Sequence, residues 1–195
     1  GLADGYFVLP YTIGDYLADD IRTGPIATDA PEFEAAEASV RSQIDAFMNN
    51  KGTKTVDYFH RKLGKIIWNK CGMSRNEKQL KEAMKEVKAL REEFYKEVYV
   101  PGTADSFNEP LAKALRVADF LELGELFAKD ALERSESCGG HFREESQSPE
   151  GEALRDDANF TFVSAWEYKG EPSEAKLHKE ELNYENIELK TRSYK

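Results

Sequence analysis

Apolar residues recur every three to four positions in four stretches of the chain, which predicts four amphipathic helices. The first covers about residues 32–49 and the second about residues 55–69. The third begins near Ser74 and carries the longest apolar stripe, and the fourth covers about residues 110–134. The positions expected to face inward are Phe33, Ala36, Val40, Ile44 and Phe47; Val56, Phe59, Leu63, Ile66 and Ile67; Leu80, Ala83, Met84, Val87, Leu90, Phe94 and Val98; and Leu111, Leu115, Ala118, Leu121 and Leu126.

Two Ser-x-x-Glu sequences mark the predicted starts of the third and fourth helices. They pair Ser74 with Glu77 and Ser106 with Glu109, and each can satisfy backbone donors that a helix start leaves free. A Pro-Gly pair at residues 101–102 predicts the end of the third helix. Because the connections between the predicted helices are short, neighbouring helices should run antiparallel. The sequence therefore predicts a mainly α fold, an antiparallel bundle of three to four helices.

The helical period ends after Arg134. Residues 135–159 are rich in glycine and charge and predict a long irregular connection. Residues 160–168 alternate, with Phe162, Trp166 and Tyr168 on one side, and a turn leads into a second strand at about residues 175–182. We expect a small C-terminal β-hairpin. Since an isolated hairpin is marginally stable, its aromatic side chains need a surface to cover, either the bundle or another domain.

The first residues look like part of a helix that belongs to a preceding domain. Leu2, Tyr6, Leu9 and Ile13 have near-helical spacing, with an interruption expected at Pro10, and a Gly/Pro/Thr linker follows. The chain has neither a start Met nor the layout of a signal peptide, so we expect it to be cut from a longer polypeptide. The predicted division is a helix end and linker at 1–31, a helical bundle at 32–134 and a tail with a polar turn and the hairpin at 135–195.

Charge and composition narrow the range of partners. The net charge is −10 and the basic residues are mixed with acidic ones, so no nucleic-acid partner is expected. No apolar run approaches the ~20 residues that span a bilayer, so no direct membrane span is expected. Two cysteines do not form a disulfide framework, which favours a reducing compartment.

The segment ERSESCGGHFREE, residues 133–145, raises the question of a metal site. Cys138 and His141 could face one ion, but zinc usually takes three or four protein ligands. The other candidate ligands, Cys71, His60 and His178, show no matching pair spacing. The sequence therefore predicts no metal site.

A catalytic or phosphate-binding role for the same segment is no better supported. A Cys/His nucleophilic pair needs a third orienting group, and none is identifiable. The pair Gly139-Gly140 follows a predicted helix, whereas a dinucleotide-binding fingerprint follows a strand. From residues alone we assign no catalytic and no cofactor-binding residue, and the chain reads as a helical interaction or docking module.

The same segment resembles the R-x-E-S-R-G-x-H-x-R element near the C-terminus of succinate dehydrogenase and fumarate reductase flavoprotein subunits. The positions in register are Arg134, Glu136, Ser137, Gly139, His141 and Arg143. The segment departs from this element at Cys138, where most members have Arg, and at Gly140, where Ala is common. Four further stretches resemble the family. Residues 155–159 resemble an R-D-D-x-N element, and residues 191–194 resemble a terminal R-S-Y. Residues 71–75 resemble the stretch after an early helix of the bundle, and the opening GLADGYFVLP resembles the helix that follows the flavin-contacting loop. The GGHFREE stretch and the predicted C-terminal hairpin most resemble a Bacteroidetes-like variety of this family.

The resemblance implies the chemistry of a whole subunit rather than of this chain. The family binds FAD in an upstream flavin domain, transfers a hydride between succinate or fumarate and FAD, and passes electrons to an iron-sulfur subunit attached to a membrane cytochrome b anchor. It implies a peripheral place on the inner face of the bacterial cytoplasmic membrane. The family's catalytic and FAD-binding residues would precede Gly1. We therefore expect a C-terminal fragment that is inactive alone and holds no FAD.

The resemblance also gives the odd segment a hypothetical role. We expect a polar turn that redirects the chain against the upstream flavin domain, with glycines allowing the reversal and ion pairs fixing its direction. The residues of this structural and docking motif are Arg134, Glu136, Ser137, Gly139, Gly140, His141, Arg143 and Arg192. Two alternatives remain: the same region of an L-aspartate oxidase-like flavoprotein, and a free-standing helical adaptor. Direction of the reaction and covalent or non-covalent attachment of FAD stay open.

Overall fold

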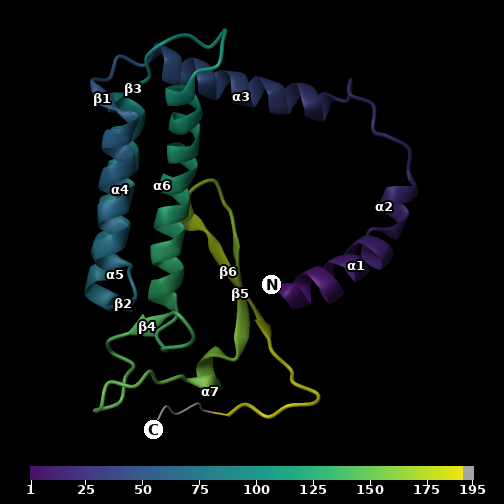
Figure 1. Cartoon of the computed structure of the whole chain (residues 1–195), viewed down its shortest axis with the longest axis vertical. Coiled ribbons are helices and arrows are strands. Elements are labelled where there is room, and N and C mark those ends of the chain that lie inside the picture. Colours follow the sequence, from purple (N-terminus) through teal and green to yellow (C-terminus); the bar gives the residue numbers. More distant parts are fainter. Residues whose placement is uncertain (191–195) are drawn as a thin grey trace. The chain divides into compact units, whose positions relative to one another are not determined.

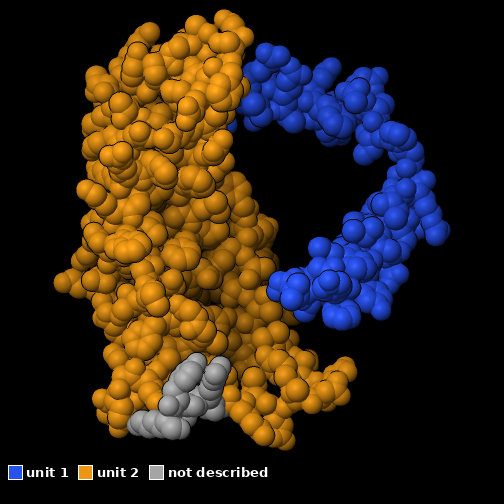
Figure 2. Space-filling model, in the orientation of Figure 1, with its two compact units in different colours: residues 1–43 blue, residues 44–195 orange. Residues whose placement is uncertain are grey.

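The computed structural model describes residues 1–190 and divides into two compact units, the first covering residues 1–43 and the second beginning at Ile44 (Figures 1 and 2). The boundary falls inside helix α3 (Pro31–Asn49). Among residues 1–190 no helix is both long and apolar enough to cross a membrane.

The first unit is a run of helical segments. They are η1 (Asp4–Val8), α1 (Leu9–Tyr11), η2 (Thr12–Tyr16), α2 (Ala18–Arg22) and most of α3. The interruption predicted at Pro10 is wrong, because the backbone stays right-handed helical on both sides of it. The turn before Pro10 is widened: the N–H of Leu9 donates to the carbonyl of Asp4, five residues back. Pro10 itself lies in the first turn of α1, where its missing N–H is tolerated.

Helix α3 is packed only at its C-terminal end. Phe47 is buried and Ile44 packs against the core, but Phe33 and Val40 are about half exposed. The prediction that this whole face points inward is therefore wrong for its first half. Periodicity shows that a face is available for burial, and it does not show that the same chain supplies the covering surface.

The second unit is built on three antiparallel helices, α4 (Val56–Lys70), α5 (Glu77–Glu97) and α6 (Glu109–Glu133) (Figure 1). Helix α5 contacts both neighbours along its apolar stripe. The core confirms the mainly α prediction. Its most deeply buried large side chains are Phe47, Phe59, Leu80, Val87, Leu90, Phe94, Val98, Val117 and Leu121. The rings of Phe47 and Phe59 meet Phe94 edge to face, at centroid distances of 5.5 and 5.2 Å.

The two predicted capping boxes are wrong by two residues. Helix α5 is capped by Asn76, whose side chain accepts from the N–H of Gln79 at 2.9 Å. Helix α6 is capped by Asn108, which accepts from the N–H of Leu111 at 2.9 Å and donates to the carbonyls of Pro101 and Thr103. Asparagine caps as well as serine. Asn108 also holds the preceding loop, whereas Asn76 donates to the side chain of Glu144.

Short strand pairs join the ends of the bundle. Strand β1 (Lys54–Thr55) runs parallel to β3 (Val98–Tyr99), and β2 (Ser74–Arg75) runs parallel to β4 (Phe142–Arg143). Next to the first pair, a Cβ at Gly52 would lie only 2.1 Å from the backbone carbon of Glu97, so the two chain segments approach as closely as glycine allows. The strand pairs therefore fix where the loops cross the helix ends.

The tail contains helix α7 (Asp157–Phe160) and an antiparallel hairpin of β5 (Phe162–Glu167) and β6 (Lys176–Glu181), with the short helix η3 (Pro172–Glu174) in its turn. Phe162 pairs with Glu181 and Trp166 with Leu177. The predicted hairpin is present, with Phe162 and Trp166 half-buried as expected, but β5 ends at Glu167 and Tyr168 beyond it is exposed. The connection over 135–159 is irregular but is held by β4 and by two isolated bridges, Cys138–His141 and Gln147–Ala153.

Candidate functional site

The polar turn, residues 134–145, begins where α6 ends. Cys138 and His141 exchange two backbone hydrogen bonds, at 2.9 and 3.0 Å, which closes a tight reversal. Gly139 lies inside it with a φ of +60°, in the left-handed region that a side chain rarely adopts. Gly140 has no positive φ and open space around it, so only the first glycine is needed for the turn.

Arg143 reaches back from β4 to cap α6. Its Nη1 donates to the carbonyls of Ala131, Leu132 and Arg134 at 3.0, 3.2 and 3.2 Å. The residue is only 3% exposed, so these bonds form away from bulk water. A helix leaves its last four carbonyls unpaired and carries partial negative charge there. A buried guanidinium at this position satisfies both needs.

Ser137 fixes the depth of the turn. Its hydroxyl accepts from the backbone N–H of Arg143 at 2.8 Å and donates to the carbonyl of the same residue at 3.2 Å. Its own N–H donates to the carbonyl of Leu154 at 2.9 Å. Ser137 is fully buried, and its hydroxyl and its N–H both have partners. The hydroxyl therefore replaces the ladder partner that β4 lacks on this edge.

Arg134 and Glu136 join the turn to the tail. Glu136 is 3% exposed; one of its oxygens accepts from Arg134 at 2.7 Å and the other from the backbone N–H of Asp156 at 2.8 Å. Arg134 also donates to the carbonyls of Phe160 and Phe162, both at 3.1 Å, and lies over both rings. The direction in which the chain enters β5 is thus set by one buried carboxylate and one guanidinium.

His141 is held as a neutral imidazole. Its Nε2 is 2.7 Å from the carbonyl oxygen of Arg134, which can only accept, so Nε2 carries the proton. Its Nδ1 is 2.8 Å from Nη1 of Arg75, which can only donate, so Nδ1 carries a lone pair. Burial lowers the pKa of His141, and the nearby guanidinium groups of Arg75 and Arg143 lower it further. A protonated ring would break the contact with Arg75.

The far end of the turn closes over the start of α5. Glu144 accepts from the side chains of Ser74 and Asn76, both at 2.8 Å, and these bonds lower its pKa. Glu145 accepts from the N–H of Glu77 at 2.6 Å, and although burial opposes it, its pKa is lowered by this and other donors, including Arg143. Carboxylates at a helix N-terminus are favourable because free N–H groups point at them. The turn therefore contacts opposite ends of two helices.

The structure brings together all the described members of the predicted motif except the exposed Gly140. Arg192 lies outside the described residues. Cys138 is exposed, and no group of three or more potential metal ligands occurs within residues 1–190. In the element at residues 155–159, Arg155 pairs with Asp157 and Asp156 caps α7.

Two features of the unit were not predicted. Arg75 belongs to the stretch 71–75 that resembles the family, but nothing in the sequence pairs it with His141. Arg91 and Glu125 are buried between α5 and α6, with Nη2 3.2 Å from the carboxylate, and Arg91 also donates to Glu171 at 2.5 Å. Burial raises the pKa of Glu125. The helical period placed Leu126 inward instead, and its neighbour Glu125 is the more deeply buried of the two.

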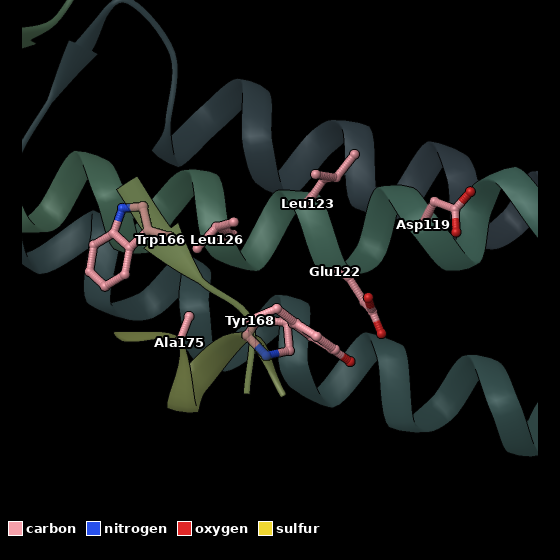
Figure 3. Close-up of a pocket in the computed structure, with 8 residues that line it drawn as sticks. Asp119, Glu122, Leu123, Leu126, Trp166, Tyr168 and Ala175 are labelled. Atoms are coloured by element: carbon pink, nitrogen blue, oxygen red, sulfur yellow. The ribbon is translucent and has the colours of Figure 1, made fainter. Parts of the chain in front are cut away.

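A groove lies between α6 and the hairpin (Figure 3). It has a volume of about 390 Å³ and is apolar where Leu123, Leu126 and Trp166 meet. Asp119 and Glu122 lie at its other end. In the polar turn, the ring nitrogens of His141 lie within hydrogen-bonding distance of Arg75 and Arg134, so the described contacts do not pair this imidazole with the thiol of Cys138.

Comparison with known proteins connects this architecture to one family. Residues 60–194 match the family model described as fumarate reductase flavoprotein C-term. The fumarate reductase flavoprotein subunit of Proteus vulgaris is 27% identical over 132 residues, which cover 68% of this chain and 21% of that protein. The chain thus spans about a fifth of the length of this curated relative.

Solved structures share the fold. A variant of the Escherichia coli quinol fumarate reductase superposes with a TM-score of 0.69 at 20% identity, over 91% of this chain and 29% of the other. The Mycobacterium smegmatis Sdh1 complex superposes with a TM-score of 0.62 at 24% identity, over 83% and 26%. The family model covers well over half of the chain and includes most of the bundle, the polar turn and the hairpin. The chain therefore belongs to the fumarate reductase flavoprotein C-terminal family.

Proposed function

We propose that this chain serves as the C-terminal helical domain of an FAD-dependent fumarate reductase or succinate dehydrogenase flavoprotein. The whole subunit would transfer a hydride between succinate or fumarate and FAD. The match of residues 60–194 to the C-terminal family carries this proposal. The curated relative from Proteus vulgaris is itself a fumarate reductase flavoprotein subunit, which supports the same activity over L-aspartate oxidation.

The partners follow from the same proposal. An upstream flavin domain of the same subunit would lie against this chain, and electrons would pass to an iron-sulfur subunit and a membrane cytochrome b anchor. Two of the solved structures with a similar fold are a quinol fumarate reductase and an Sdh1 complex, which favours a multi-subunit assembly. We place the subunit on the inner face of the bacterial cytoplasmic membrane, as a peripheral component.

Neither the groove beside α6 nor the turn at Gly139 has the features of an FAD cradle. The groove beside α6 ends in two carboxylates, Asp119 and Glu122, which would repel a pyrophosphate. The turn at Gly139 is exposed and follows a helix, whereas a dinucleotide cradle lies between a strand and a helix N-terminus. We therefore propose a contribution of this chain that does not involve contact with the cofactor.

This contribution is structural: the polar turn fixes the positions of α5, α6 and the tail relative to one another. Arg143 caps α6, Glu145 accepts from the first N–H of α5, and Arg134 orients the start of β5, so one short segment fixes two helix ends and the tail. In the proposed subunit this rigid corner would present the tail to the flavin domain in one direction. The motif is then a positioning element whose loss weakens flavin retention or assembly.

The test uses the polypeptide encoded by the complete reading frame that carries this chain. We expect the purified protein to contain one FAD and to reduce fumarate with a reduced viologen dye. Arg143→Ala should lower the FAD content or the recovery with an iron-sulfur subunit, while Arg41→Ala, at an exposed i,i+4 pair, should not.

Three outcomes would contradict parts of this proposal. Oxidation of L-aspartate without fumarate reduction would identify an L-aspartate oxidase instead. A protein without flavin and without either activity would favour a free-standing helical adaptor. Unchanged FAD content and unchanged assembly in Arg143→Ala would leave the family assignment standing and remove the positioning role.

A further inference from the structure

The groove between α6 and the hairpin continues beyond the part drawn in Figure 3. A second hollow, of about 560 Å³, shares Leu123, Leu126 and Trp166 with the first and extends toward Phe127. Both hollows open to solvent along their length. The result is an elongated surface groove rather than an enclosed cavity.

The apolar part of the groove is exposed yet held in place. Leu123 is 59% exposed and Tyr168 is 60% exposed, so both present apolar surface to solvent. The indole N–H of Trp166 donates to Asp130 at 2.7 Å, and the ammonium of Lys129 lies 4.8 Å from the centre of its ring. Lys129 also donates to the carbonyls of residues 172, 173 and 175 in the hairpin turn. The wall is therefore preorganised, which lowers the entropic cost of binding.

The opposite end of the groove has an excess of negative charge. Asp119 forms no ion pair with any residue in the described part of the chain. Glu122 lies 4.0 Å from Arg91, but that guanidinium already pairs with Glu125 and Glu171. Lys88 is another cation near Glu125 and Glu171. Burial raises the pKa of Tyr95, and the negative charges of Glu122 and Asp119 raise it further. Arg116 lies three residues before Asp119 on α6, but the two form no ion pair. Because like charges three residues apart on a helix repel, a cation from outside would stabilise Asp119 and Glu122.

We propose that this groove binds a segment of a partner polypeptide that carries a basic side chain a few residues away from an apolar one. Charge complementarity carries the choice: the basic group would lie between Asp119 and Glu122, and the apolar side chain against Leu126 and Trp166. Residues 119 and 126 are seven positions apart, which corresponds to ~10 Å along a helix. An extended segment covers this distance with about three residues.

The shape of the groove favours a polypeptide over a small ligand. Small-molecule sites are concave and enclose most of the ligand surface. Here an open trough runs along one helix. Its middle is apolar, Asp119 and Glu122 lie at one end, and Asp130, which accepts from the indole N–H of Trp166, lies at the other. The proposal concerns the second unit alone and does not depend on the activity of the whole subunit.

The test is an array of immobilised peptides that is probed for binding of the full chain. Ten-residue peptides carry one Lys or Arg and two Leu or Phe at varied spacing, and matched peptides carry Glu in place of the basic residue. Labelled peptides that bind are then measured in solution by fluorescence anisotropy. We expect the best binders to have the basic and apolar residues about three positions apart. The Glu-substituted peptides should bind at least tenfold more weakly.

Two variants locate the site. The double variant Asp119→Asn/Glu122→Gln should weaken the best peptide about five- to tenfold, in line with the loss of one or two surface ion pairs. Leu123→Ala, at an exposed position, should weaken it as well. The double variant Glu92→Gln/Asp105→Asn changes the net charge equally at residues that do not line the groove, and it should bind as the parent does.

Four results would overturn the proposal. They are the absence of any peptide that binds more tightly than about 1 mM, equal binding by the Asp119/Glu122 variant, and a concentration-dependent dimer that Leu123→Ala abolishes, which would make a second copy the occupant. The fourth is hexylammonium binding as tightly as the best peptide, which would indicate a small-molecule site.

Discussion

Replacing Arg143 by alanine should lower the free energy of unfolding of the second unit more than a substitution at an exposed residue does. Its Nη1 carries two hydrogens, so the three carbonyl contacts at 3.0–3.2 Å amount to about two full hydrogen bonds. A hydrogen bond to a charged group contributes about 1.5 kcal/mol or more when buried, and a cation at a helix C-terminus adds several tenths. Because Arg143 is 3% exposed, little water can take its place. We expect a loss of about 3 kcal/mol.

The assay is urea unfolding of the full chain followed by circular dichroism, with the slope of the transition compared between variants. Arg143→Lys keeps the charge but not the planar donor pair, so about half of the stability should return. Amide exchange should show faster exchange at the N–H of Arg134, which bonds to Asp130 in the last turn of α6. Arg41→Ala should leave the midpoint unchanged. An Arg143→Ala protein within about 0.5 kcal/mol of the parent would refute the capping argument.

Three further changes test other parts of the structure. Gly52→Ala should cost about 3 kcal/mol because the new Cβ would lie 2.1 Å from backbone, while Gly64→Ala, in open space on α4, should stabilise by about 0.5–1 kcal/mol; equal midpoints in urea would contradict this. His141 has a lowered pKa in the folded state, so the unfolded chain binds its proton first and stability should fall as pH drops below about 6.5. His141→Gln should remove that part of the pH dependence, and an unchanged slope between pH 7.5 and 5.5 would count against a neutral ring. Arg91→Met should cost about 3 kcal/mol at neutral pH by leaving Glu125 buried and unpaired, and less at pH 5, where Glu125 can take up a proton; a pH-independent loss would show that the charge is not the cause.

The helices of the bundle follow from the sequence because their apolar stripes are long and regular. Leu80, Val87 and Phe94 are fully buried, as their spacing predicts. The caps could not be placed to the residue, since Ser74 and Asn76 both have side chains that can accept from a helix start and lie two positions apart. Only the path of the preceding chain decides between them, and β2 takes Ser74 out of reach.

The resemblance to a known family predicts the polar turn, but it does not predict the contacts that the side chains of this turn make. The three carbonyls that Arg143 contacts are backbone groups and carry no signal in the sequence. The buried pair of Arg91 and Glu125 was missed for a related reason. The sequence around each residue does not indicate its partner, and the pairing exists only because α5 and α6 lie side by side. Such pairs require the tertiary structure.

The capping of α6 by a residue ten positions beyond its end also governs how this domain can be shortened. A version that stops at Arg134 would retain every residue of the three-helix core but none of Glu136, Ser137 or Arg143, and its last helical turn would fray. Since Glu136 in turn accepts from the backbone of Asp156, a minimal expressible domain should extend at least to the end of α7. A domain defined by its three core helices is therefore shorter than the domain that its hydrogen bonds require.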